Sequence, residues 1–269
     1  MYSPIMKRKA LLLLLAACAS CEKDIHLDYR TAEARYVVEA SISQSGAEAT
    51  VTTTQAMDDN TYSHAVTDAR VILTSGDSIR QALTHRGKGR YTADLCGQPG
   101  TTYRLTVETG GQTFTSSSTM PAATRILSFR FVWREMLGQR YLFGDLRLQD
   151  EPGRSNYYFM HLYRGGIGYR WAVMTDRAAP GGELQQLFTC QRENSNSSDA
   201  LREGDRLHLV VRTIDQRAYD YLYSMQVMDE AGSNPIDNFS GGCLGYFSAY
   251  HQLTLDTVFR FSEVKEAND

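Results

Sequence analysis

Short segments in which apolar and polar residues alternate follow one another along the chain from residue 35 onward. The first segment places four apolar residues on one face, namely Tyr36, Val38, Ala40 and Ile42. This period of two is typical of a strand with one buried face. Comparable strand candidates cover residues 49–55, 70–74, 91–95, 103–107 and 113–117. Because turn residues separate these short strands, we predict an immunoglobulin-like or transthyretin-like β-sandwich over residues 35–119.

A second β-rich region is predicted over residues 120–269, after a boundary at Met120-Pro121. Aromatic residues alternate with others at Phe129, Phe131 and Trp133. Further strand candidates cover residues 142–148, 156–163, 169–174, 184–190, 207–211 and 246–261. The segment 156–163 is aromatic on both faces, which favours a central strand. The pattern leaves open whether this region is a second β-sandwich or a barrel-like domain.

One helix interrupts the β pattern near residues 215–231. Its apolar positions recur at helical spacing, at Ala218, Tyr221, Leu222, Met225 and Met228. Asp215 is suited to cap the first turn, and Gly232 to end the last. The fold class is therefore all-β, with a sandwich, a second β-rich domain and one α-helix.

The first 17 residues have the features of a signal peptide. Lys7-Arg8-Lys9 supplies a positive start, and residues 10–17 form an apolar run that contains five leucines. That run is too short to span a bilayer, which takes about 20 apolar residues. The segment therefore predicts export rather than a transmembrane helix.

The end of this segment fits a lipobox. Leu15-Ala16-Ala17-Cys18 places small residues before a cysteine whose sulfur would take a diacylglycerol. Residues 18–34 are polar and aperiodic, so they are expected to tether the lipid to the fold. Cys21 is the alternative lipid site, with a poorer residue three positions before it. We expect an outer-membrane lipoprotein, lipid-anchored on the periplasmic or cell-surface face and held by two or three acyl chains.

Composition and motifs point away from several function classes. The formal net charge of -3 and the charged fraction of 22% show no basic excess for nucleic acid. Six scattered histidines lack metal-ligand spacing, and no catalytic motif is found. We therefore predict a non-enzyme without metal or cofactor apart from the covalent lipid. Asp58-Asp59-Asn60 is more simply a solvated turn than a calcium loop. The oligomeric state stays open.

Three cysteines remain beyond the lipid site. Cys190 and Cys243 both belong to the second region, and exported proteins retain disulfides, so we predict that these two pair. Cys96 would then be a buried thiol. The alternative is that all three are reduced and buried.

Aromatic residues are the remaining hint of a binding surface, since aromatics dominate interfaces as well as cores. The candidates for a ligand or partner surface are Tyr157, Tyr169, Trp171, Tyr246 and Tyr250.

The order of several short motifs resembles one family. In the first half the motifs are Cys21-Glu22-Lys23, Tyr36-Val37-Val38-Glu39-Ala40, Gly89-Arg90-Tyr91, Pro99-Gly100-Thr101-Thr102-Tyr103-Arg104-Leu105-Thr106-Val107 and Ser118-Thr119-Met120-Pro121. In the second half they are Asn156-Tyr157-Tyr158, Ala218-Tyr219-Asp220-Tyr221 and Gly245-Tyr246-Phe247-Ser248-Ala249. Together they resemble the Bacteroidetes-type outer-membrane lipoproteins of the domain of unknown function 4249, DUF4249. In that family the lipid cysteine usually precedes Glu-Lys, which favours Cys21.

The resemblance implies an accessory role in ligand capture or uptake, beside a TonB-dependent receptor. It offers no catalytic residues. The leading hypothesis is thus a non-catalytic accessory lipoprotein. The alternative is a structural or adhesive surface protein, and a hydrolase with a dispersed site is more remote.

Overall fold

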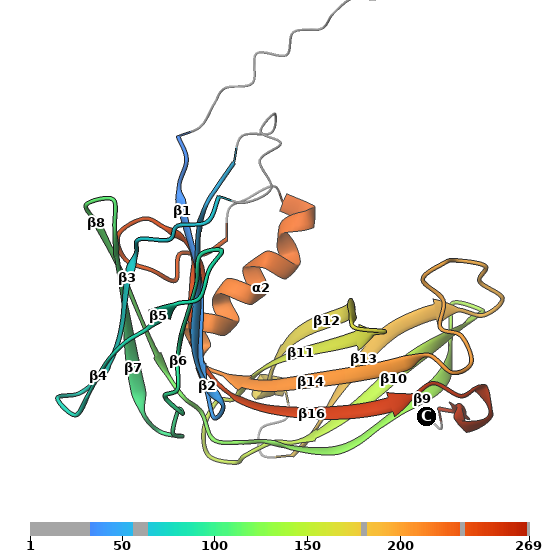
Figure 1. The fold of residues 1–269 in the computed structure, drawn as a ribbon. Coiled ribbons are helices and arrows are strands. Elements are labelled where there is room, and N and C mark those ends of the chain that lie inside the picture. Colours follow the sequence, from blue (N-terminus) through green and yellow to red (C-terminus); the bar gives the residue numbers. More distant parts are fainter. Residues whose placement is uncertain (1–32, 56–63, 179–181, 232–234, 268–269) are drawn as a thin grey trace, which may run out of the picture. The chain divides into compact units, whose positions relative to one another are not determined.

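The computed structural model describes residues 33–55, 64–178, 182–231 and 235–267. Strands dominate this part of the chain, with a single α-helix among the described residues (Figure 1). The all-β class is confirmed. The described residues from Ala34 onward belong to one unit, in which two β-sandwiches follow one another.

The first sandwich stacks a five-stranded sheet on a four-stranded sheet. The five-stranded sheet has the order β15 (Leu244–Ala249), β1 (Tyr36–Ser43), β2 (Gly46–Thr53), β6 (Arg90–Ala93) and β5 (Thr84–His85). The other has the order β4 (Ile79–Ala82), β3 (Arg70–Ser75), β7 (Thr102–Thr109) and β8 (Gln112–Thr119). Both sheets send their apolar positions into one core, with Val38, Leu105 and Phe114 among its members. The alternation predicted for residues 36–43 is the alternation of burial in β1.

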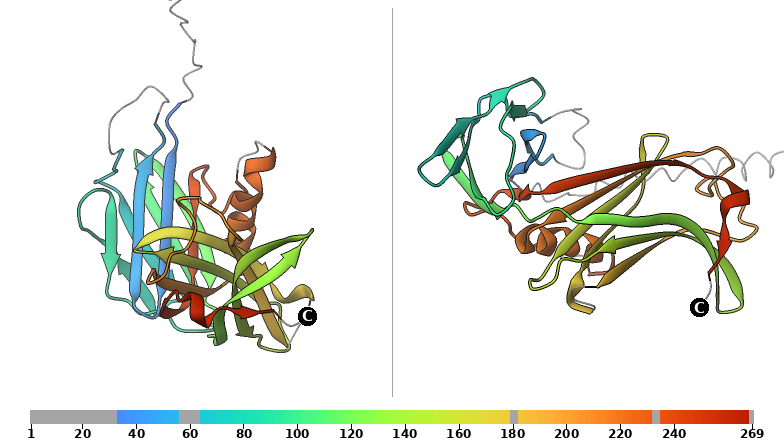
Figure 2. Two further views of the ribbon diagram at one scale, coloured as in Figure 1. Left: turned by 90° about the vertical axis from the view of Figure 1, so that its right-hand side faces the viewer. Right: turned by 90° about the horizontal axis from the view of Figure 1, so that it is seen from below.

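The second sandwich is built from two four-stranded sheets (Figure 2). One has the order β13 (Glu183–Arg192), β10 (Gln139–Gln149), β9 (Arg125–Met136) and β17 (Lys265–Glu266). The other has the order β12 (Ile167–Thr175), β11 (Tyr157–Arg164), β14 (Arg206–Ile214) and β16 (His251–Val258). Short 3-10 turns lie at Asp176–Ala178 and Phe261–Glu263. A second core fills the space between the sheets. Of the two forms predicted for this region, a second β-sandwich and a barrel-like domain, the sandwich is correct. Strand β11 is a central strand, as its aromatic faces indicated.

Helix α2 (Gln216–Ala231) follows β14 directly. Asp215 caps it as predicted, because its Oδ1 accepts a hydrogen bond from the Ala218 N–H at 2.9 Å. The other carboxylate oxygen accepts from the Thr119 N–H at 3.1 Å, at the end of β8. One carboxylate therefore both starts the helix and ties it to the first sandwich. The predicted stop at Gly232 lies outside the described residues.

Strand β15 departs from the predicted domain boundary. It lies within residues 120–269, yet it pairs in parallel with β1 and packs into the first core. Gly245 makes the approach possible with a φ of +99°, because a Cβ there would lie 2.0 Å from the Val38 carbonyl oxygen. The pairing joins segments that are far apart in sequence, so local periodicity carries no sign of it.

Side chains bond the other edge of β15. The Phe247 N–H donates to Asn238 Oδ1 at 2.9 Å, and the Ala249 N–H donates to Ser118 Oγ at 2.8 Å. Ser116 Oγ also donates to Asn238 Oδ1, at 2.7 Å. Because all these groups are buried, the bonds replace the water that the backbone would otherwise need. They tie β15 to β8, and so to the second sheet of the first sandwich.

Three short strands, β4, β5 and β17, were not predicted. Nearly all of their residues are exposed, so they have no apolar face to produce a period of two.

Candidate functional site

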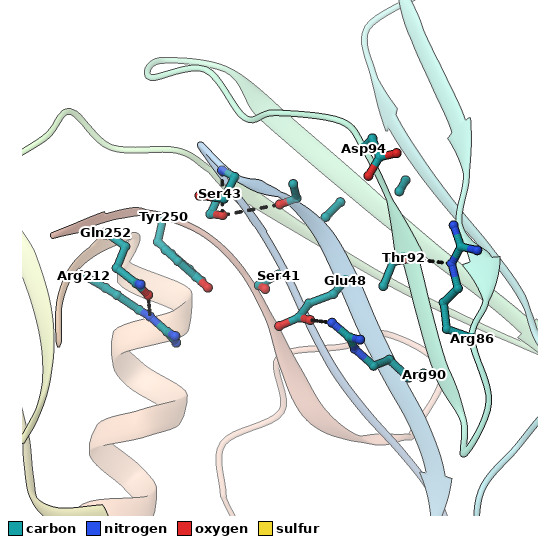
Figure 3. Close-up of a pocket in the computed structure, with 14 residues that line it drawn as sticks. Ser41, Ser43, Glu48, Arg86, Arg90, Thr92, Asp94, Arg212, Tyr250 and Gln252 are labelled. Carbon is teal, nitrogen blue, oxygen red and sulfur yellow. Dashed lines mark hydrogen bonds and ion pairs between the residues drawn. The ribbon is translucent and has the colours of Figure 1, made fainter. Parts of the chain in front are cut away.

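A polar cleft of about 620 Å³ lies beside the outer face of β1, β2 and β6 (Figure 3). Polar and charged side chains make up most of its wall, namely Ser41, Ser43, Ser45, Glu48, Arg86, Arg90, Thr92, Asp94, Arg212, Tyr250 and Gln252. A hollow of about 310 Å³ adjoins it and shares five of these residues. The volume is within the range of small-molecule sites, roughly 300–1,000 Å³.

Strand alternation supplies one wall of the cleft. Ala40 and Ile42 of β1 point into the first core, so Ser41 between them faces outward. Ser41 pairs with Glu48 of β2, which pairs in turn with Thr92 of β6. Three adjacent strands thus present a row of polar side chains to the cleft.

The opposite wall is held by backbone contacts to the same sandwich. The Tyr250 N–H donates to the Ile42 carbonyl at 3.0 Å, which extends the pairing of β15. The Gln44 side chain bonds both backbone groups of Gln252: its Nε2 donates to the carbonyl at 2.7 Å, and its Oε1 accepts from the N–H at 3.1 Å. These bonds set the position of Tyr250 and Gln252 relative to Ser41.

Arg212 of β14 is held in one orientation at this wall. Its Nε donates to Gln252 Oε1 at 2.8 Å, and its Cζ lies 4.3 Å from the centre of the Tyr250 ring. The centre of the Phe159 ring lies 5.7 Å from the same carbon. Burial, followed by the charge of Arg212, lowers the pKa of His161. Figure 3 shows Arg212 and Tyr250 directed across the cleft toward Ser41.

Two further arginines line the cleft from β6 and the turn before it. Arg90 forms an ion pair with Glu48 at 3.0 Å. Arg86 Nε donates to Thr92 Oγ1 at 3.1 Å. The cleft therefore contains cations whose hydrogen-bonding capacity is only partly used.

The predicted aromatic residues do not form one surface. Tyr157, Tyr246 and Tyr250 belong to a third core cluster, which lies against helix α2. Tyr246 stacks on Tyr221 of the helix with ring centres 5.0 Å apart, and burial raises its pKa to about 12. Of the five candidates, Tyr250 lines the main cleft, and Tyr246 lines the adjoining hollow.

Tyr169 and Trp171 lie elsewhere, on β12. Residues two apart on a strand normally share a face, but the β11–β12 ladder skips Tyr169 at a bulge. Tyr169 therefore packs against the second core, and its hydroxyl donates to the Cys190 carbonyl at 2.9 Å. Trp171 is 40% exposed, with its ring centre 6.2 Å from that of Phe159.

The predicted disulfide is wrong. Cys190 is buried in the second core, whereas Cys243 is buried in the first, and both thiols are free. The reason is that the chain has already returned to the first sandwich at residue 243, immediately before β15. Cys96 is also free, but it is exposed rather than buried.

We expect one fast-reacting thiol in the native chain that carries Cys18→Ala and Cys21→Ala. Thiolates are the reactive species, and burial raises the pKa of Cys190 to about 11 and that of Cys243 to about 12. DTNB at about pH 8 should therefore modify Cys96 first and the other two only after unfolding. A Cys96→Ala variant should show no fast reaction. Recovery of one thiol from the unfolded, unreduced chain would mean that Cys190 and Cys243 are joined after all.

No metal site is formed by the described residues, where histidine, cysteine, aspartate and glutamate make no suitable group of three or more. Asp58-Asp59-Asn60 lies outside the described residues, as do Cys18 and Cys21. In the part of the chain that the structure describes, no helix has the length and apolar character needed to cross a membrane.

Sequence reasoning missed most of the cleft. One signal was present, since Arg212 interrupts a largely apolar run in the sequence of β14. The serines and Glu48 looked like ordinary solvent-facing positions of two strands. Nothing local showed that β14 would bring a guanidinium opposite them.

Comparison with known proteins places the chain in a family. A family model described as a domain of unknown function (DUF4249) matches residues 22–256. The chain belongs to the DUF4249 family. This DUF4249 chain has no match among curated proteins.

Among solved structures, the DUF4249 chain is similar to a DUF4785 family protein from Legionella pneumophila subsp. pneumophila str. Philadelphia 1. The two share 15% identity at a TM-score of 0.24, over 69% of this chain and 54% of the other. The DUF4249 chain thus spans about half the length of that structure.

Proposed function

We propose that this DUF4249 protein is a lipid-anchored, non-catalytic binding protein of the outer membrane. It captures a small polar ligand in the cleft and works beside a TonB-dependent receptor. The observation that carries the proposal is the cleft of about 620 Å³ whose wall at Tyr250 and Gln252 is fixed by Gln44 and Ile42. A pre-formed cavity with convergent polar groups is what ligand capture requires.

The chemistry of the lining supports binding over catalysis. The residues that line the cleft in the described chain include serines but neither histidine nor cysteine. A serine becomes a nucleophile when a base lies within hydrogen-bond reach, and Ser43 instead bonds the Gly46 carbonyl. The polar side chains of the cleft are therefore suited to holding a ligand by hydrogen bonds.

Sequence features support the membrane part of the proposal. The lipobox at Leu15-Ala16-Ala17-Cys18 would direct lipidation, and the family resemblance implies outer-membrane placement near a receptor. A lipid anchor on a tether would hold the ligand-binding body close to a transporter, where a high local concentration favours transfer.

A pull-down of the lipidated protein from detergent-solubilised outer membranes tests the proposal. We expect near-stoichiometric recovery of a TonB-dependent transporter, identified by mass spectrometry. The control is the full chain with Cys18→Ala and Cys21→Ala, which should recover little because it never reaches the membrane. Recovery of no partner by a correctly lipidated protein would overturn the receptor role and favour a structural or adhesive surface protein.

A further inference from the structure

Arg212 differs from three other half-buried arginines of the second sandwich. Among the described residues it shares the lack of an ion pair with Arg134, which lies outside the cleft lining. Arg147, Arg164 and Arg170 are each between 21% and 28% exposed at the side chain, and each forms an ion pair with a carboxylate. Arg212 is also half-buried, yet it has no ion pair among the described residues. Within the described part of the chain, its side chain donates a hydrogen bond from Nε to Gln252 Oε1, a neutral amide oxygen.

The contacts of Arg212 leave the terminal guanidinium nitrogens directed at the cleft. The Nε group already donates to Gln252 Oε1. The Tyr250 ring covers one face of the guanidinium, with its centre 4.3 Å from Cζ. The orientation is therefore fixed, while the Nη groups remain as donors. Partial burial of a charge is costly unless a partner of opposite charge arrives. A planar guanidinium held in this way is suited to bidentate bonding of an oxyanion.

We infer that the cleft takes a ligand that carries a carboxylate or phosphate group, and that Arg212 binds this group. The inference deepens the proposed function and rests on it. Tyr250 and Ser41 lie on either side of the space that Arg212 faces, and their hydroxyls are available to the same group (Figure 3). Glu48 pairs with Arg90, so a cation lies beside this carboxylate and offsets its repulsion of an anion.

The row of polar side chains on β1, β2 and β6 specifies the rest of the ligand. Ser41, the Glu48–Arg90 pair and Thr92 offer hydrogen-bond donors and acceptors but little apolar surface. A ligand with an anionic end and a hydroxyl- or amide-bearing body is complementary to such a wall. Long hydrocarbon chains are not.

Isothermal titration of the lipidated protein in neutral detergent tests the inference. The probes are succinate for the carboxylate, inorganic phosphate for the phosphate, and glucose as an uncharged reference. We expect one of the two anions to bind. Arg212→Gln should weaken it at least about tenfold, because it removes a charge-assisted pair of hydrogen bonds. Arg212→Lys should retain part of the affinity, more for phosphate than for carboxylate.

The matched control is Arg70→Gln, which removes one exposed arginine of the first sandwich, outside the cleft lining. It should bind the anion as the unaltered protein does, and thermal melts should show that all variants are folded. Equal anion affinity in Arg212→Gln, or no anion binding by the unaltered protein, overturns the inference. If the inference about Arg212 fails but glucose binds or the transporter is recovered, the proposed function still holds, without an anionic ligand. If no probe binds and the pull-down recovers no transporter, both the inference about Arg212 and the proposed function are overturned.

Discussion

Replacing Gly245 by alanine is expected to lower the free energy of unfolding by about 3 kcal/mol or more. A Cβ at this position would lie 2.0 Å from the Val38 carbonyl oxygen and 2.7 Å from its carbon, atoms of the neighbouring strand that cannot move without breaking the β1–β15 pairing. The φ of +99° adds strain for any residue with a side chain. Urea unfolding followed by circular dichroism measures the loss.

Gly242→Ala is the matched control for this prediction. Gly242 has a similar φ of +88°, but nothing lies within 4 Å of the Cβ that alanine would add. Its loss should be about 1 kcal/mol, from backbone strain alone. Similar losses at the two positions would mean that the close approach of β15 to β1 contributes nothing.

The same substitution should also weaken ligand binding. Tyr250 follows β15 directly, and its N–H bonds the Ile42 carbonyl as a continuation of that strand. Displacement of β15 therefore displaces one wall of the cleft. At temperatures where Gly245→Ala is still folded, its affinity for an anion should fall, whereas that of Gly242→Ala should not.

Cys18→Ala is expected to move nearly all of the protein from the membrane fraction to the soluble fraction. The proposed diacylglycerol would be attached through the cysteine sulfur, so alanine would leave no acceptor. Without the acyl chains no stable anchor remains, because the net charge of -3 shows no basic excess to bind anionic lipid. Membrane fractionation and the intact mass of the mature protein measure the effect.

Cys21→Ala and Cys96→Ala are the controls for the anchor. Both should remain in the membrane fraction with the lipid mass unchanged. Release by Cys21→Ala alone would place the lipid on Cys21, as the Cys21-Glu22-Lys23 motif of the family resemblance favours. Retention of the Cys18→Ala/Cys21→Ala double variant would contradict lipid anchoring altogether.

Elements with one buried face were predictable from the sequence. In β1 Val38, Ala40 and Ile42 are buried and the residues between them are not, since adjacent residues of a strand point to opposite sides. Helix α2 was found by its spacing and by its Asp215 cap, because both signals lie within a few residues. The buried face differs from the predicted one at Met225, which is exposed, and at Ser224, which is buried. The strands β4, β5 and β17 were missed because exposed residues leave no periodic trace.

The candidate site was much less predictable than the elements that carry it. Tyr250 and Tyr246 were among the predicted aromatic residues, but Tyr169 was separated from Trp171 by a bulge that spacing does not show. The two cysteines expected to pair lie in different cores, because β15 leaves the second region for the first.

The all-β class, most of the strands, helix α2 with its cap, and the family could all be inferred from the sequence. Each of these depends on neighbours along the chain, where side-chain direction follows from backbone period alone. The pairing of β15 with β1, and the position of Arg212 opposite Ser41 in a polar cleft, depend on contacts between residues far apart in the sequence. Strand partners are chosen by burial, close backbone approach at Gly245 and bonds from distant side chains such as Asn238, and no local window contains those contacts.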